Sequence, residues 1–269
     1  MLRTRVLTAV VLIALVLAGL FLFPPAAWIA FASAVLALAA WEWGGLAGLT
    51  RLGRLAFAAL LPILLLGLLE LSSDVSYGAR LVYGLAVVFW ALVVPVSLWR
   101  QPGLRATAAG LLSGVFVLVP SFFALVALRA LSPFLLLAIM LLVWISDSAA
   151  YFAGKRWGRR KLAPSISPGK TWEGVFGAMA AVAIYALLWA EWGRALIPAG
   201  SVAGAPAALI GFSLVLTAAG IVGDLFKSLL KRQADVKDSG DLLPGHGGIL
   251  DRIDAMVAVL PFAALVFGA

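Results

Sequence analysis

The chain has 269 residues, of which 64% are hydrophobic and 12% charged, and its mean hydropathy of +1.10 excludes soluble folds and predicts a polytopic membrane protein. It contains no Cys, which excludes disulfides, thiolate catalysis and Cys-ligated metal sites. The net charge of +8 is typical of basic loops between membrane spans, and since no nucleic-acid-binding motif accompanies it, no nucleic-acid partner is expected.

Nine apolar stretches long enough to cross a bilayer follow one another along the chain. A spanning helix needs roughly 20 predominantly apolar residues, and Pro, Gly and charged clusters separate the candidates. The predicted spans cover residues 6–23, 26–47, 55–71, 81–99, 106–127, 133–153, 174–193, 205–230 and 253–269. The first resembles a signal peptide but lacks a clean cleavage site, so we expect it to remain as a span. Pro24 and Pro25 make the next connection very short, because Pro has no backbone donor with which to continue a helix.

The basic residues alternate between the two sides of this segmentation. Of the 20 Lys and Arg residues, only Arg80, Arg129 and Arg194 fall on the minority side if nine spans begin inside the cell. Lys and Arg are retained in short cytoplasmic loops. We therefore predict an all-α integral membrane protein of about nine spans with a cytoplasmic N-terminus. The loops predicted to be cytoplasmic include 51–54, 100–105, 155–173 and 231–252.

Acidic residues at the predicted membrane boundary concentrate in the second half of the chain. A charge inside an apolar helix costs roughly 2.5–3.5 kcal/mol on insertion scales and usually marks a site. Those near the predicted cytoplasmic ends of the last four spans are Asp147, Glu173, Asp224, Asp251 and Asp254. We therefore predict a scaffold of about five spans over residues 1–132. Residues 133–269 form a catalytic region of about four spans, with cytoplasmic loops 154–173 and 231–252 and the active site at its cytoplasmic face.

The sequence GDLFKSLLKR places polar residues on one face of the eighth span. Asp224, Lys227, Ser228 and Lys231 occupy positions i, i+3, i+4 and i+7, which share a helix face. We expect this stripe to point into the bundle. Two interpretations stay open on this fragment alone: a functional site, or an Asp–Lys pair that anchors the helix at the interface.

Residues 231–254, KRQADVKDSGDLLPGHGGILDRID, contain five Asp and the only His of the chain. Glycines 245, 247 and 248 allow backbone conformations closed to other residues and a close approach to a ligand. Asp251 and Asp254 lie one turn apart on the predicted entering helix. Such a carboxylate pair suits Mg²⁺, which takes one or two carboxylates plus substrate phosphates. Alternatively, Asp251 complements the helix dipole and Asp254 pairs with Arg252 or a Lys.

The other polar residues of this stretch leave more than one interpretation open. A lone His246 between glycines is either a general base or a hydrogen-bonding loop residue, and no second His or Ser-His-Asp spacing supports zinc or triad chemistry. Asp235, Asp238 and Asp241 are spaced as a solvated charge run would be. Asp238, next to Lys237, is the one we favour as a site residue.

A second polar cluster, KRWGRRKLAPSISPGKTWEG, precedes the seventh span. Its GKT does not complete a P-loop, because Pro164 stands where the motif requires its first Gly. The cluster is either a basic surface that attracts anionic lipid headgroups or an electrostatic cradle for phosphate groups with Lys170 as a point charge.

Taken together, these motifs resemble those of the phosphatidate cytidylyltransferase, or CDP-diacylglycerol synthase, family. The C-terminal motif is carried by Ser228, Leu230, Lys231, Arg232, Lys237, Asp238, Leu243, Pro244, His246, Gly247, Gly248, Asp251, Arg252 and Asp254. Upstream, KLAPSISPGKTWEG and WISDSAAYFAGK are similar to the family's loop and preceding helix end, with Gly169 where a basic residue is frequent. The specific resemblance covers residues 144–254, and the first half is similar only in hydropathy.

The resemblance implies transfer of the cytidylyl group from CTP to phosphatidic acid, with Mg²⁺, a monovalent cation such as K⁺ beside it, and a homodimer. The catalytic residues expected from it are Asp224, Lys231, Arg232, Asp238, His246, Asp251 and Asp254. Substrate contacts are expected from Ser167, Lys170, Thr171, Ser228, Lys237, Gly247, Gly248 and Arg252, and metal ligands from Asp147, Asp224, Asp251 and Asp254. Because phosphatidic acid is already anionic, positioning and charge neutralisation suffice, which agrees with a site rich in Asp, Lys and Arg. A membrane lipid-alcohol kinase, a phosphate or nucleotide transporter and a structural lipid-surface protein remain alternatives.

Overall fold

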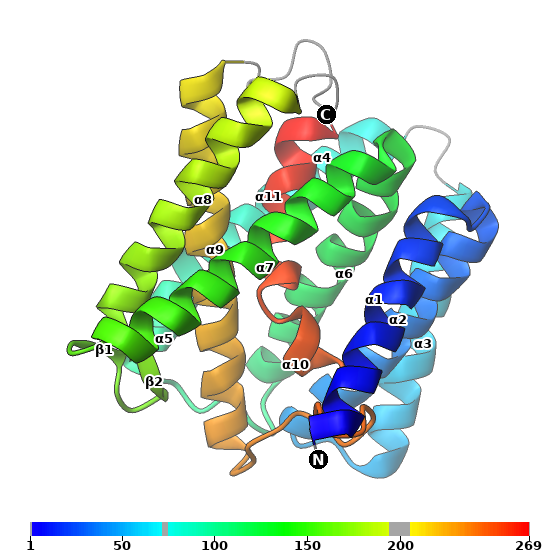
Figure 1. Ribbon diagram of the computed structural model, residues 1–269. Helices are drawn as coiled ribbons and strands as arrows, with labels where there is room; N and C mark the ends of the chain where they lie inside the picture. Colours follow the sequence, from blue (N-terminus) through cyan, green and yellow to red (C-terminus); the bar gives the residue numbers. More distant parts are fainter. Residues whose placement is uncertain (1, 72–74, 194–204, 269) are drawn as a thin grey trace.

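The computed structural model describes residues 2–71, 75–193 and 205–268, which are mostly helical (Figure 1). The helices are α1 (Leu2–Phe21), α2 (Pro25–Leu46), α3 (Arg51–Leu71), α4 (Val75–Val88), the π-helical turn η1 (Phe89–Val93), α5 (Val94–Arg100), α6 (Ala108–Leu131), α7 (Pro133–Trp157), α8 (Trp172–Trp192), α9 (Pro206–Gln233), α10 (Leu250–Ile253) and α11 (Met256–Phe267). Each stretch predicted as a span contains helix, although a turn separates α10 from α11. Arg194 and residue 269, on which parts of the predicted topology fall, lie outside the described residues.

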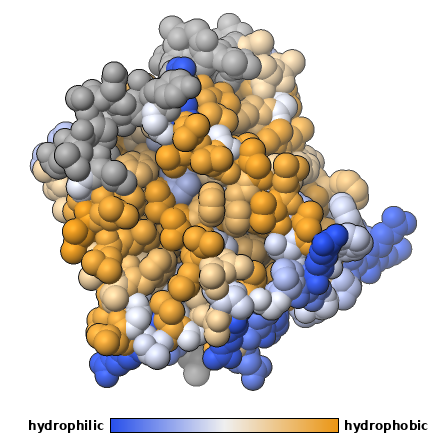
Figure 2. All heavy atoms as spheres, turned by 180° about the vertical axis from the view of Figure 1, so that it is seen from behind, coloured by the Kyte–Doolittle hydropathy of each residue, from blue (hydrophilic) through white to orange (hydrophobic). Residues whose placement is uncertain are grey.

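Several of these helices have the length and composition of membrane spans. In the described part of the chain, six segments qualify: Pro25–Leu46, Gly78–Arg100, Ala108–Leu131, Pro133–Trp157, Trp172–Trp192 and Pro206–Gln233. Val6–Phe21 and Met256–Phe267 are shorter apolar helices. Figure 2 shows a broad hydrophobic surface with hydrophilic residues gathered along its lower edge. The protein is therefore a helical, polytopic integral membrane protein, as its composition predicts.

Prolines set the beginnings of three helices. Pro25, Pro133 and Pro206 each lie in a first helical turn, where the missing N–H has no intrahelical partner to lose. Helix α1 ends at Phe21 and α2 begins at Pro25, which confirms the short connection predicted at the Pro24–Pro25 pair.

A small antiparallel hairpin interrupts the segment between α7 and α8, where the sequence predicts only a basic loop. Its strands are β1 (Lys161–Ala163) and β2 (Ser167–Thr171). The all-α prediction is corrected in this detail, because strands this short beside Pro164 show no alternation of apolar and polar residues to reveal them. Ile166, between the strands, is buried, and its carbonyl accepts a hydrogen bond of 3.2 Å from Arg232 Nε. The hairpin is thereby fastened to the end of α9.

Helices α7 and α8 approach closely because small residues face each other. A Cβ placed on Gly177 would lie 2.4 Å from the Cβ of Ala153, so no larger residue fits there without movement. Small residues bring helix backbones together in membranes in this way. The Thr171 side chain caps α8 and so joins β2 directly to that helix. This arrangement holds Lys170, on β2, beside α9.

The buried core joins the two predicted regions of the chain. One cluster of buried side chains contains Leu20 together with Leu135 and Val259. A second contains Trp43 and Phe226, whose ring centroids are 6.3 Å apart. Helix α11 lies within the bundle in Figure 1, against α6 and α9. The boundary predicted after residue 132 falls between α6 and α7, but the packing extends across it.

Loops between the helices meet at one edge of the bundle, although residues 51–54, predicted as a cytoplasmic loop, form the first turn of α3. The Ala106 N–H donates to the Ala47 carbonyl at 2.8 Å, which joins the loops that precede α3 and α6. Gln101 Nε2 lies 2.9 Å from Ser165 Oγ in the hairpin. The N-terminus, β1–β2 and α10 lie toward this same edge in Figure 1. The polar residues singled out by the sequence are brought together here.

Candidate active site

Acidic and basic side chains from separate segments meet at this edge of the bundle. Lys170 of β2 forms a salt bridge of 2.5 Å with Asp224 of α9. One turn further along α9, Lys227 Nζ lies 3.1 Å from Asp251 Oδ1 and also pairs with Asp254. The predicted stripe on α9 therefore faces the protein interior, and its charges pair with other elements. We call Lys170, Asp224, Lys227, Lys231, Asp251 and Asp254 the charged cluster.

Asp251 has both carboxylate oxygens engaged by protein donors. Its Oδ1 accepts from Lys231 Nζ at 2.8 Å in addition to the contact with Lys227. Its Oδ2 accepts from the backbone N–H groups of Ser239 (2.8 Å) and Gly248 (3.1 Å), and the Ser239 hydroxyl oxygen lies 3.1 Å from it. Burial raises the pKa of Asp251, but these hydrogen bonds and the Lys227 charge outweigh it and hold the pKa well below its usual range. Asp251 is therefore ionised at neutral pH.

Asp224 and Asp254 form a pair of like charges. The two carboxylates lie within electrostatic reach of each other, and Asp147 of α7 lies within electrostatic reach of both. The Asp224 and Asp254 side chains are 29% and 16% exposed, against 3% for Asp251, so a ligand can reach them. The Ser228 hydroxyl is 3.5 Å from Asp224 Oδ1, at the outer limit of a hydrogen bond. Two carboxylates this close need a cation beside them, which the neighbouring lysines supply.

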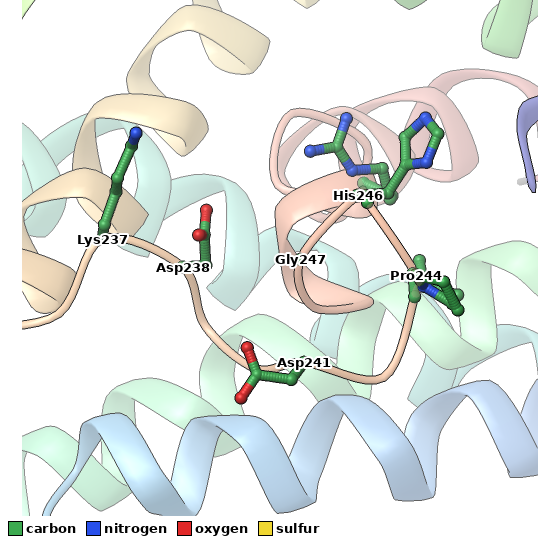
Figure 3. Close-up of a pocket in the computed structure, with 9 residues that line it drawn as sticks. Lys237, Asp238, Asp241, Pro244, His246 and Gly247 are labelled. Carbon is green, nitrogen blue, oxygen red and sulfur yellow. The ribbon is translucent and has the colours of Figure 1, made fainter. Parts of the chain in front are cut away.

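The loop between α9 and α10 borders a pocket of about 650 Å³ (Figure 3). Its lining consists of Lys237, Asp238, Asp241, Leu243, Pro244, Gly245, His246, Gly247 and Arg252. Gly245 and Gly247 have φ angles of 75° and 79°, which confirms the backbone conformation predicted for them. Gly248 is needed for close approach instead, because a Cβ there would lie 2.3 Å from Glu42 Oε2. A Cβ on Gly247 would lie 2.9 Å from Asp251 Oδ2, so the pocket adjoins the charged cluster.

The structure places the predicted site residues in three settings. Lys170, Asp224, Lys231, Asp251 and Asp254 belong to the charged cluster, and Lys237, Asp238, His246, Gly247 and Arg252 line the pocket. Others make contacts of the fold: Arg232 donates to the hairpin, Thr171 caps α8, and Ser167 pairs with Ala163 across the strands. The His246 Nδ1 atom is buried and has no hydrogen-bond partner among the described residues. Asp254 lies in the turn between α10 and α11 instead of on one continuous helix with Asp251, because the helix is interrupted there.

Glu42 of α2 also belongs to this site, although the sequence analysis assigns its helix to the scaffold. The residue is 1% exposed. Its Oε1 accepts from the Ile249 N–H at 2.8 Å, and its Oε2 from the Leu250 N–H at 2.9 Å and the Ser239 hydroxyl at 2.7 Å. The signal in the sequence that could have found it is a carboxylate within an apolar helix.

Comparisons with known proteins agree with one another. Residues 3–269 match the model of a family described as the cytidylyltransferase family. A phosphatidate cytidylyltransferase of Pseudomonas aeruginosa is 41% identical over 285 residues, which cover 100% of this chain and 98% of the relative. One of Haemophilus influenzae is 36% identical over 287 residues, covering 97% of each chain. One of Bacillus subtilis is 46% identical over 120 residues, which cover 45% of this chain and 42% of that protein.

Proposed function

Because this chain belongs to the cytidylyltransferase family, we propose that it transfers the cytidylyl group of CTP to phosphatidic acid and so forms CDP-diacylglycerol and pyrophosphate. The observation that carries the proposal is the similarity over the whole chain to relatives of that activity. The charged cluster supports it, because phosphoryl-type transfer depends mainly on positioning and on neutralising negative charge.

The reaction needs no activated protein nucleophile. A phosphate oxygen of phosphatidic acid attacks the α-phosphorus of CTP, a new P–O bond forms, and the bond to the β-phosphate breaks to release pyrophosphate. Since the attacking oxygen is already anionic, the protein's task is to hold two highly negative substrates together. Lys170 and Lys231 are placed to contact their phosphates, as cationic point charges.

We propose that Asp224 and Asp254 hold Mg²⁺. Their partly exposed carboxylates present the hard oxygen ligands that this ion prefers, whereas the side chain of Asp251 is almost fully buried. In the described part of the chain, no three acidic or His side chains are grouped to hold a metal, so substrate phosphates and water complete the coordination in this proposal. When bound, Mg²⁺ neutralises charge on the phosphates. Asp147 is the next carboxylate within reach, and K⁺ beside the divalent ion stays a prediction from the family resemblance.

The pocket beside the charged cluster is the proposed nucleotide site. Its volume of about 650 Å³ lies in the range of small-molecule sites. Lys237 and Arg252 supply positive charge for a triphosphate, and Asp238 and His246 supply polar atoms for the nucleoside. The contact of Gly247 with Asp251 places this pocket next to the lysines that would receive the phosphates.

The edge that carries the site faces the cytoplasm of a bacterium in our proposal, with the N-terminus on the same side. Two observations support this orientation: basic residues concentrate in the loops that meet there, and the relatives are bacterial proteins. Membrane lipids surround the remaining surface, nine spans cross the bilayer, and two copies associate as a homodimer. Impermeant maleimide should label Leu52→Cys and Gly103→Cys only in inverted vesicles, and labelling from outside would contradict the orientation.

A lipid assay tests the reaction itself. Purified protein is given CTP labelled in the α-phosphate, with phosphatidic acid or diacylglycerol as acceptor. We expect label to enter the lipid fraction only with phosphatidic acid and Mg²⁺, with release of pyrophosphate. In a parallel sample with CTP labelled in the γ-phosphate, transfer of label to diacylglycerol would instead identify a lipid kinase, and the absence of any transfer in both samples would contradict the proposal.

A further inference from the structure

Glu42 is a buried carboxylate with no cationic partner in the part of the chain that the structure describes. Among the described residues no Lys or Arg forms a salt bridge with it, and it lies in an apolar helix between Trp41 and Trp43. Burying an ionised group is costly unless hydrogen bonds satisfy it. Its donors all come from the segment 239–250, about 200 residues away in sequence. That segment forms the end of the pocket loop and the beginning of α10.

The shape of the loop matches this carboxylate closely. A Cβ on Gly240 would lie 2.8 Å from Glu42 Oε1, and one on Gly248 would lie 2.3 Å from Oε2. Both distances are shorter than the roughly 3 Å that Cβ contacts require, so the loop backbone lies directly against Glu42. Together with the three hydrogen bonds, this contact fixes the loop against α2.

Ser239 connects Glu42 to the charged cluster. Its hydroxyl lies 2.7 Å from Glu42 Oε2 and 3.1 Å from Asp251 Oδ2, and its N–H donates to that same Asp251 oxygen. The other oxygen of Asp251 accepts a hydrogen bond from Lys231 and forms a salt bridge with Lys227. A contiguous hydrogen-bonded path therefore runs from α2 to the two lysines on α9.

We propose that Glu42 is a positioning residue for cytidylyl transfer. It holds the 239–250 segment so that Asp251 and its lysines, and the pocket walls between α9 and α10, keep the geometry that CTP requires. The inference rests on the proposed function. Its specific content is that a residue of the predicted scaffold controls the nucleotide side of the site and leaves the lipid side unchanged.

Glu42→Gln is the informative change, because it keeps the size of the side chain but replaces an acceptor oxygen with an N–H donor that faces other donors. We expect kcat to fall and KM for CTP to rise, each roughly tenfold or more, since hydrogen bonds to a charged group are lost in a buried site. KM for phosphatidic acid should stay within about twofold. Glu191→Gln is the matched control, because Glu191 is exposed at the far end of α8 and should leave every constant unchanged.

A second measurement follows the loop without using activity. The chain has no Cys, so Leu242→Cys introduces a single thiol on an exposed loop residue. Its reaction rate with maleimide should rise several-fold in the Glu42→Gln background, because the loop is released from α2. If Glu42→Gln does not yield folded protein, Ser239→Ala replaces it: this variant keeps the N–H bond to Asp251 and should shift both readouts in the same direction by less.

The outcomes separate the two proposals. Unchanged KM for CTP and an unchanged labelling rate, with only a lower melting temperature, would make Glu42 an ordinary structural residue and overturn the inference. A wild-type protein that forms no CDP-lipid would sink the proposed function, and the labelling experiment would still report whether Glu42 holds the loop.

Discussion

Asp251 and the Asp224–Asp254 pair lie in one charged cluster, yet the protein buries them to different extents. Asp251 is almost fully buried, and both of its oxygens are occupied by lysines and loop donors. The Asp224 and Asp254 carboxylates lie within electrostatic reach of each other and keep partial exposure. Similar residue types at similar positions in the sequence therefore suit different tasks. The first is suited to holding the loop in place, and the second to binding what enters the site.

The largest effect is expected from removing a charge of the exposed pair. Asp224→Asn or Asp254→Asn keeps the side-chain size but removes charge that Mg²⁺ requires, so turnover should fall on the order of 10³-fold while the protein still purifies normally. CDP-lipid formation over a Mg²⁺ titration measures this. The double variant should lose much less than the product of the two single losses, because both residues serve one ion. Fully multiplicative losses would mean that the two carboxylates act independently.

Asp251→Asn should reduce activity less, and stability more, than the substitutions of Asp224 and Asp254. An amide cannot satisfy both the lysines and the two backbone N–H donors of the loop, so we expect turnover to fall about 10- to 100-fold and the melting temperature in detergent to drop. Because the pKa of Asp251 is lowered in the folded state, its charge stabilises the protein above the ordinary carboxyl pKa, and this contribution disappears only as the pH falls through the lowered value. The Mg²⁺ concentration for half-maximal activity should stay unchanged. A large shift in this Mg²⁺ concentration would indicate that Asp251 is itself a metal ligand. Asp251 would then not differ in role from Asp224 and Asp254.

Lys170→Ala tests whether the exposed pair has a specific cationic partner. Lys170 is partly exposed and has little packing to lose, so KM for CTP or phosphatidic acid should rise about tenfold with no change in melting temperature. Lys161→Ala is the control, because it removes an exposed cation from the same hairpin. Equal losses in both variants would favour general attraction of anionic lipids over a direct phosphate contact.

The helices were largely predictable because a bilayer demands long apolar stretches, and Pro and charged residues mark their ends. The acidic residues of the second half were also visible, since a charge in an apolar helix stands out. The ion pairs that these residues form could not be predicted. A stripe with Asp224 and Lys227 one turn apart invites a local ion pair, but in the structure each bonds to a partner on another segment. Only the three-dimensional packing of α9 against β2 and α10 decides this.

The role of Glu42 could not be read from the sequence for a different reason. Two of its three donors are backbone N–H groups, which almost every residue possesses. The sequence therefore contains no complementary side chain that would indicate this contact. The hairpin was missed because its strands are too short to show a period. The charges were therefore predictable, and the neutral groups that orient them were not.

The smallest effect should come from Asp235, which belongs neither to the charged cluster nor to the residues that line the pocket. It is exposed and has a φ of 56°, in the left-handed region that Asn tolerates as well as Asp does. Asp235→Asn should therefore change stability by less than about 0.5 kcal/mol and leave kcat, KM and the Mg²⁺ titration as in the wild type. The same assays used for Asp224 and Asp251 give the measurement. A loss comparable to that of Asp251→Asn would mean that negative charge anywhere in the stretch matters, so that the individual placement of each carboxylate would no longer explain the site.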